Sequence, residues 1–102
     1  MALTKNKHRY LLVRSSVGID ALNAYDIKKA LFEKLGMRFH LAALKIISMQ
    51  GNYLIIRCSL KSFDDVVAAL TMIKNINGSR IAFYTIKSSG TIKSLQKKGI
   101  SA

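Results

Sequence analysis

The sequence predicts an α+β domain of the ferredoxin-like type, in which a four-stranded antiparallel sheet carries two helices on one face and a short C-terminal helix follows. The chain has 102 residues, half of them hydrophobic, which suits one domain with a modest core. Apolar residues recur in strand and helix periods in the order β-α-β-β-α-β. We therefore expect residues 1–102 to form a single domain, with the polar residues 1–8 flexible.

Three stretches of the chain show the pattern of strands. Apolar and polar residues alternate in HRYLLVRSS, which predicts a strand over residues 9–15. Residues 40–60 predict two strands around the turn 50–52, where a glycine permits the reversal. The stretch SRIAFYTIKS, residues 79–88, predicts the fourth strand.

Two helices are expected between these strands. Asn23 and Asp26 have the three-residue spacing of a capping pair, and apolar residues at helical spacing then predict a helix over residues 23–35. Ser62 and Asp65 repeat that spacing before the second helix. The apolar residues that predict the second helix are Val66, Val67, Leu70 and Ile73.

The charge of the chain favours a polyanionic partner. Seventeen Lys and Arg residues oppose five Asp and Glu residues, a formal net charge of +12. Nucleic acid is the usual partner of so basic a small domain, and an anionic membrane surface is the alternative. No apolar run approaches the roughly 18 residues of a membrane span, so we expect no membrane insertion. One cysteine and no signal-like segment predict a cytoplasmic protein.

The sheet face opposite the helices is the first candidate surface. In this topology the first and third strands are central, and aromatic, apolar and basic side chains alternate outward along them. We expect this face to meet another protein or the third helix of the chain, because base stacking calls for flat rings rather than branched aliphatic residues. The predicted protein-interface residues are Tyr10, Leu12, Tyr53, Ile55 and Arg57.

Basic residues near both ends of the chain are the second candidate surface. Residues 88–99, SSGTIKSLQKKG, place small residues before a short lysine-rich helix over about 92–98, and a helix N-terminus favours anions. The alternative is a simple helix cap with solvated lysines. We expect the first and fourth strands to lie on opposite sides of the sheet's interior pair, so that the two basic clusters need not merge. The predicted RNA-binding residues are Lys5, Lys7, Arg9, Arg14, Lys87, Ser89, Gly90, Thr91, Lys93, Lys97 and Lys98.

The residues give little support to an enzyme. The turn lacks the spacing of a nucleotide-binding loop, and His8 and His40 are too few and too far apart for a zinc site. Cys58 is expected on the inward face of a strand, where a thiol is buried and inert. We therefore expect no active site and no protein-bound cofactor or metal.

Four segments resemble the ribonuclease P protein component 2 family, the small archaeal counterpart of a eukaryotic ribonuclease P and MRP subunit. These segments cover about residues 8–98. The most specific part of the resemblance is the motif IIRC together with SGTIK, which follows the fourth strand. The four segments are HRYLLVR, DIKKALFEKLG, YLIIRCSLKSFDDVVAALTMI and SSGTIKSLQKK.

The resemblance implies a non-catalytic subunit of a ribonucleoprotein endoribonuclease. In that family the RNA removes the 5′ leader from precursor tRNA with magnesium, and the protein helps the RNA hold its active form. The resemblance also implies a barrel-shaped protein partner and a possible self-dimer. It places an archaeal member in the cytoplasm and a eukaryotic one in the nucleus.

Two alternatives remain open at the level of the sequence. One is a ferredoxin-like ribosomal or general RNA-binding module without a dedicated partner. The other is a small-molecule regulatory domain of the same topology, which the net charge disfavours.

Overall fold

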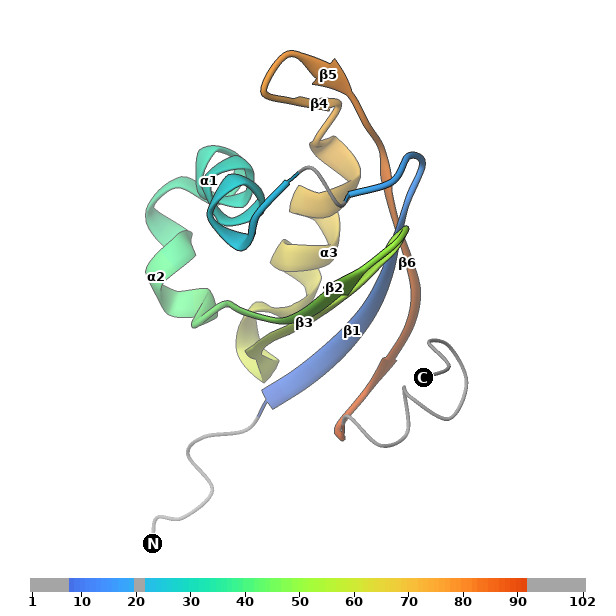
Figure 1. Cartoon of the computed structure of the whole chain (residues 1–102). Coiled ribbons are helices and arrows are strands. Elements are labelled where there is room, and N and C mark those ends of the chain that lie inside the picture. The colour runs from blue at the N-terminus through green and yellow to red at the C-terminus, as the bar shows by residue number, and fades with distance from the viewer. Residues whose placement is uncertain (1–7, 20–21, 92–102) are drawn as a thin grey trace, which may run out of the picture.

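A computed structural model of the chain describes residues 8–19 and 22–91. A four-stranded antiparallel sheet forms one layer and helices form the other (Figure 1). The sheet order is β2-β3-β1-β6. Its strands are β1 (His8–Ser15), β2 (Lys45–Gln50), β3 (Tyr53–Ser59) and β6 (Phe83–Ser89). The expected β-α-β-β-α-β order is confirmed, and the expected third helix over residues 92–98 lies outside the described residues.

Helix α1 (Ala24–Leu35) forms where the sequence predicts it, and its start shows why. The Asn23 side chain accepts a hydrogen bond from the Asp26 backbone N–H at 3.0 Å, and the Asp26 carboxylate accepts one from the Asn23 N–H at 3.1 Å. This reciprocal pair satisfies two N–H groups that a helix start leaves without partners. Gly36 ends the helix with a positive φ of 59°, a conformation that glycine adopts without strain.

Helix α3 (Phe63–Met72) begins differently from the prediction. A short 3-10 turn, η2 (Leu60–Ser62), leads into it, and the Ser62 side chain makes no capping hydrogen bond. Asp65, the expected capping partner, instead accepts a hydrogen bond from Arg38 at 3.1 Å. The predicted Ser62–Asp65 cap is therefore wrong, because the 3-10 turn holds Ser62 at φ −100° and ψ 7°, outside the extended geometry of an N-cap.

Two segments adopt structure that the strand patterns did not predict. Residues 36–42 are helical, as η1 (Gly36–Arg38) and α2 (Phe39–Ala42), so the second strand begins only at Lys45. Residues 75–80 form a separate hairpin of β4 (Asn75–Ile76) and β5 (Ser79–Arg80), which shortens the fourth sheet strand at its start.

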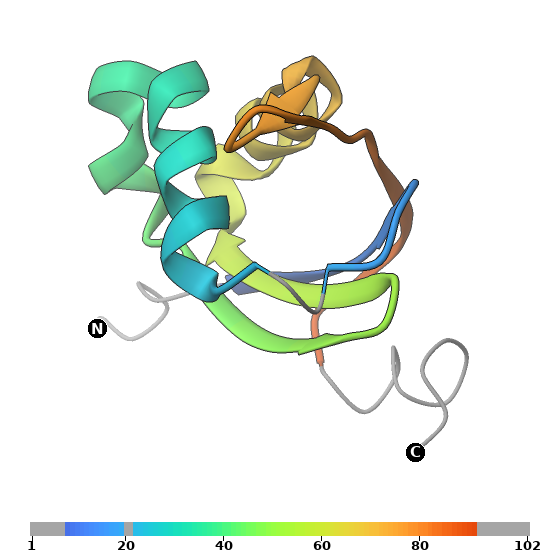
Figure 2. The ribbon, with the colours of Figure 1, turned by 45° about the horizontal axis from the view of Figure 1, so that its top comes forward.

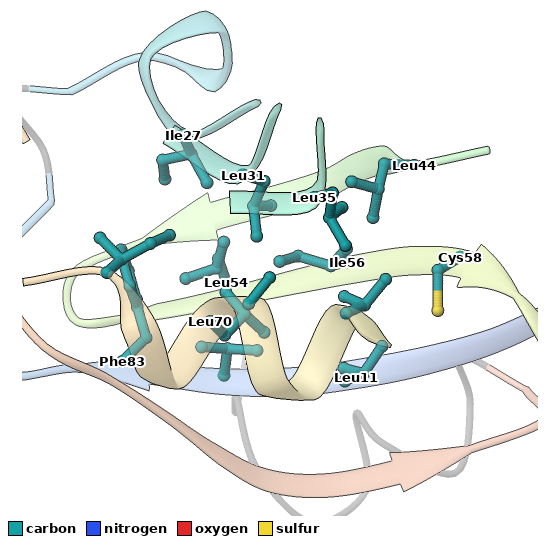
Figure 3. Close-up of a cluster of buried hydrophobic side chains, with 14 of the residues drawn as sticks. Leu11, Ile27, Leu31, Leu35, Leu44, Leu54, Ile56, Cys58, Leu70 and Phe83 are labelled. Carbon is teal, nitrogen blue, oxygen red and sulfur yellow. The ribbon is translucent and has the colours of Figure 1, made fainter. Parts of the chain in front are cut away.

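The main core lies between the helices and one face of the sheet (Figure 3). Leu11 and Val13 of β1 and Leu54, Ile56 and Cys58 of β3 point toward α1 and α3 and are fully buried. The helices contribute their apolar stripes, so burial of apolar surface holds the two layers together. The stripe residues buried in the core are Ile27, Leu31, Leu35, Val66, Ala69 and Leu70.

A second, smaller apolar cluster occupies the opposite face of the sheet, called the outer face below. Leu12 and Ile55 lie directly opposite each other on β1 and β3, and each is only 1% exposed. Tyr10, Ile47 and Tyr53 pack against them. No helix among the described residues covers this face, which is the lower side of the sheet in Figure 2.

Candidate nucleic-acid interface

The strand register arranges the outer face in three rows that run across the sheet. Side chains alternate between the two faces of a strand, so residues directly opposite one another in register share a face. The rows are Gln50, Tyr53, Arg14 and Tyr84; then Ser48, Ile55, Leu12 and Lys87; then Lys45, Arg57, Tyr10 and Ser89. Each row draws one residue from every strand of the sheet.

The first row places an arginine between two tyrosines in the strand register. Arg14 of β1 is paired with Tyr53 of β3 on one side and with Tyr84 of β6 on the other. Arg14 and Tyr84 also line a pocket of about 450 Å³ together with Ser16 and Ile86. Exposed arginine and tyrosine side chains of this kind can contact both the phosphates and the base faces of RNA.

A bulge in β6 enlarges the exposed part of this face. The register between β1 and β6 shifts between Leu12 and Val13, which leaves Ile86 as an extra residue before Lys87. Ile86 is exposed, and Lys87 lies opposite Leu12. The bulge thus sets a lysine beside the small apolar cluster, since a bulge redirects the side chains of its strand.

The outer face carries positive charge without a described carboxylate to neutralise it. Arg14, Lys45, Arg57 and Lys87 lie on it. Within the described residues, the carboxylates all belong to the helices: Asp26 and Glu33 on α1, Asp64 and Asp65 on α3. A surface with cations and no compensating anions attracts polyanions.

Arg57 adds an unsatisfied donor to this surface. Its Nε is buried and has no hydrogen-bond partner among the described residues. A buried N–H group without a partner is destabilising, and a guanidinium group binds phosphate oxygens well. Arg57 and Lys45 are also register partners, and two neighbouring cations favour an anionic ligand on their row.

The described members of the two predicted basic clusters lie on neighbouring strands of the sheet. β1 pairs directly with β6, so the start of the first strand lies beside the end of the last one. Tyr10 is opposite Ser89, and the Arg9 guanidinium donates to the Ser88 hydroxyl at 3.2 Å. The expectation that the first and fourth strands lie on opposite sides of the interior pair is wrong, because the first strand is central and the fourth is its neighbour.

Arg9 differs from the other predicted RNA-binding residues. Its guanidinium lies 5.6 Å from the centre of the Phe63 ring, on the side of the sheet that bears the helices. Cys58, its register partner on β3, belongs to the main core. Burial raises the pKa of the Cys58 thiol to about 11, and the positive charge of Arg9 opposes part of that rise. A thiol held in this protonated form is a poor nucleophile.

A hydrogen bond between neighbouring residues holds the turn after β6. The Thr91 backbone N–H donates to the Ser89 side chain at 3.2 Å. Gly90 is exposed, with open space around its α-carbon. The other predicted RNA-binding residues at the ends of the chain lie outside the described residues: Lys5, Lys7, Lys93, Lys97 and Lys98.

The predicted protein-interface residues share the outer face with Arg14 and Lys87. Leu12 and Ile55 are almost fully buried, so only the half-buried Tyr10, Tyr53 and Arg57 of the predicted set can meet a partner. The sequence did not single out Lys45 and Tyr84. Sequence patterns alone could not have found them, because each becomes the neighbour of a predicted outward residue only through the register between strands.

Comparison with known proteins identifies the family of the chain. The profile of the Rpp14/Pop5 family matches residues 9–100. The chain belongs to the Rpp14/Pop5 family. Within the described residues of this family member, none of the helices is long and apolar enough to cross a membrane.

Curated relatives and a solved structure agree with this membership. The chain is 31% identical to ribonuclease P protein component 2 of Thermococcus kodakarensis, over 92% of this chain and 83% of that one. It is 29% identical to the protein of the same name from Archaeoglobus fulgidus, over 92% and 89%. A chain in the cryo-EM structure of yeast ribonuclease MRP has the same fold, with a TM-score of 0.69 at 13% identity, covering 88% of this chain and 79% of that chain.

Proposed function

We propose that this chain is a protein subunit of ribonuclease P and that it binds the catalytic RNA through the outer face of its sheet. The observation that carries the proposal is the combination of family membership with a cationic, tyrosine-bearing face that has no described carboxylate. Relatives over nearly the whole chain bear the name ribonuclease P protein component 2.

We assign the outer face to RNA instead of the protein partner expected from the sequence, because the strand register adds cations and a third tyrosine to that face. Arg14, Arg57 and Lys87 neutralise phosphates where RNA strands approach one another, and the tyrosines Tyr10, Tyr53 and Tyr84 stack on unpaired bases or riboses. The protein thereby supports the active form of the RNA at a lower magnesium concentration. The RNA, with magnesium, performs the removal of 5′ leaders from precursor tRNA, and the protein supplies no catalytic group.

The basic ends of the chain extend this interface in the proposal. Ser89 ends β6 beside Tyr10 of the outer face, and Gly90 and Thr91 follow it. Lys93, Lys97 and Lys98 follow them in sequence and would add phosphate contacts, as would Lys5 and Lys7 before β1. A barrel-shaped protein subunit and a second copy of this chain are the further partners that we propose for the assembly.

Reconstitution tests the role. The chain, the catalytic RNA and the barrel-shaped subunit from one source are combined, and precursor tRNA cleavage is measured over a range of magnesium concentrations. We expect this chain to lower the magnesium concentration that half-maximal cleavage requires. If cleavage is the same with and without the chain at every magnesium concentration, the proposed role is wrong.

A further inference from the structure

A second surface feature lies in the helix layer, on the other side of the molecule from the outer face. A pocket of about 350 Å³ is lined by Tyr25, Lys28, Lys29 and Phe32 of α1 and by Phe39 of α2. Nothing in the proposed RNA contact uses these residues. The pocket is therefore a candidate binding site that is separate from the RNA contact.

The walls of the pocket are aromatic and ordered by ring contacts. Phe32 and Phe39 meet edge to face, with ring centres 5.2 Å apart, and Phe39 meets His40 in the same manner at 5.8 Å. Tyr25, which also lines the pocket, is 68% exposed. Aromatic rings bring large apolar contact area at low entropic cost, and this makes them common anchors in protein interfaces.

Two exposed apolar side chains lie close in sequence to the pocket residues Phe32 and Phe39. Met37, in the turn between α1 and α2, is 92% exposed, and Leu41 of α2 is 72% exposed. Large apolar side chains that are exposed together mark protein interaction sites more often than they mark free surface. Methionine and aliphatic groups suit a protein partner better than a nucleobase, which prefers flat rings.

Charge restricts the kind of protein partner. Lys28 and Lys29 border the pocket, and no carboxylate of the described residues lines it. Lys29 also lines a second pocket, with Asp26 and Glu33, and the Asp26 carboxylate there accepts a hydrogen bond from the Asn23 N–H. A partner segment with carboxylates would complement the two lysines, whereas a second copy of this chain would bring the same lysines against them.

We propose that this pocket docks an acidic segment of a partner protein, which inserts one aromatic or aliphatic side chain between Tyr25, Phe32 and Phe39. Its carboxylates pair with Lys28 and Lys29. This is the groove-binding mode in which an apolar anchor gives affinity and flanking charges give specificity. The proposal is independent of RNA binding by the outer face, so either can fail without the other.

Nuclear magnetic resonance with defined probes tests the docking. The full chain is titrated with four ligands: an Asp/Glu-rich peptide with one central Phe, the same peptide with Ala in place of Phe, a Lys-rich peptide with the central Phe, and a short oligo-uridylate. We expect only the acidic peptide with Phe to shift the ring signals of Phe32 and Phe39 in a saturable way. Lys28→Glu combined with Lys29→Glu should weaken that binding roughly tenfold or more.

Matched variants distinguish binding in the pocket from a general effect of charge and from a loss of folding. Lys61→Glu combined with Lys74→Glu reverses two exposed charges outside the pocket and should leave peptide binding unchanged. Phe32→Ala keeps both lysines and should remove the dependence on the central Phe, with the fold checked by circular dichroism.

Three results would overturn the proposal. The first is the absence of ring shifts with the acidic peptide that carries Phe. The second is an equal or stronger response to oligo-uridylate, which would make the pocket an RNA site. The third is a dimer, detected by sedimentation, that Phe32→Ala dissociates, which would make a second copy of the chain the occupant.

Discussion

Leu12 lies on the outer face of the sheet but is buried from solvent. Its side chain points away from the helices but is 1% exposed, because Ile55 lies opposite and Tyr10 and Tyr53 pack around the pair. A residue in this position stabilises the sheet itself. Its substitution therefore acts first on folding and only then on assembly.

The burial of Leu12 leads to a stability prediction. Leu12→Ala should lower the free energy of unfolding by about 2–5 kcal/mol, the usual range for removing a buried leucine. Ile86→Ala, on the same face but exposed, is the matched control and should cost about 0.5 kcal/mol or less. Urea denaturation measures both. Equal losses would show that Leu12 is open surface rather than core.

Cys58 gives a prediction about pH. Burial raises the pKa of its thiol from 9.0 to about 11, so the folded state keeps the proton that the unfolded state releases. The contribution to stability is complete below pH 9 and is lost as the pH rises toward 11, by at most about 1.4 kcal/mol per pH unit.

The comparison with Cys58→Ala isolates this effect. Lysines and tyrosines titrate in the same range in both proteins, so the difference in unfolding free energy between wild type and variant reports the thiol. We expect that difference to fall between pH 9 and 11. A difference that stays constant over this range would show that the folded-state pKa of Cys58 is not raised.

Among the elements, the starts of α1 and α3 form a natural pair for comparison. Asn23→Ala removes the side-chain half of the capping pair and should lower the free energy of unfolding by about 1 kcal/mol. Ser62→Ala removes a hydroxyl that makes no capping hydrogen bond and should cost less than half as much. Thermal unfolding of the two variants checks the order. A larger loss for Ser62→Ala would mean that α3 is the capped helix.

The order of the main elements was predictable because each one has a strong local pattern. The first strand alternates, the first helix has a capping pair and a terminal glycine, and Gly51 sits in the turn before β3 with a φ of 61°. These signals depend only on neighbouring residues, which is why sequence alone was sufficient for them.

The missed elements each have a physical reason. Residues 39–42, FHLA, combine apolar character with helix-forming leucine and alanine, and such a short run does not distinguish a strand from a helix. Asn77 and Gly78, with φ values of 53° and 82°, form the turn of the β4–β5 hairpin. An Asn-Gly pair is the strongest short hairpin signal, so this turn could have been found.

The candidate site was only partly predictable, because it depends on register between distant segments. Arg14 and Arg57 were predicted to point outward from their strands, and the strand pairing places both of them on the outer face. The bulge that positions Lys87 beside Leu12, and the pairing that places Tyr84 beside Arg14, arise only when β1 and β6 meet. No local pattern in the sequence encodes that register.

At the scale of the whole molecule, charge divides the two layers. The described carboxylates lie in the helix layer, where Asp65 pairs with Arg38, and the outer face of the sheet carries cations without them. A chain with a net charge of +12 repels itself, and a polyanion on one face relieves that repulsion. The absence of described carboxylates from the outer face therefore supports the proposed RNA contact there.

The salt dependence of RNA binding is the most direct test of that contact. The affinity of ribonuclease P RNA is measured at several salt concentrations for the wild type and for a variant in which Arg14, Arg57 and Lys87 are all changed to Gln. The control changes three exposed lysines outside the outer face, Lys34, Lys61 and Lys74, to Gln.

If the outer face binds the RNA, its variant should lose affinity and the slope of log affinity against log salt should fall by about two, since each lost phosphate contact removes roughly 0.7–0.9. The control should change the slope by much less. A slope that is unchanged in the outer-face variant, or one that falls as much in the control, would contradict the assignment of RNA binding to this face.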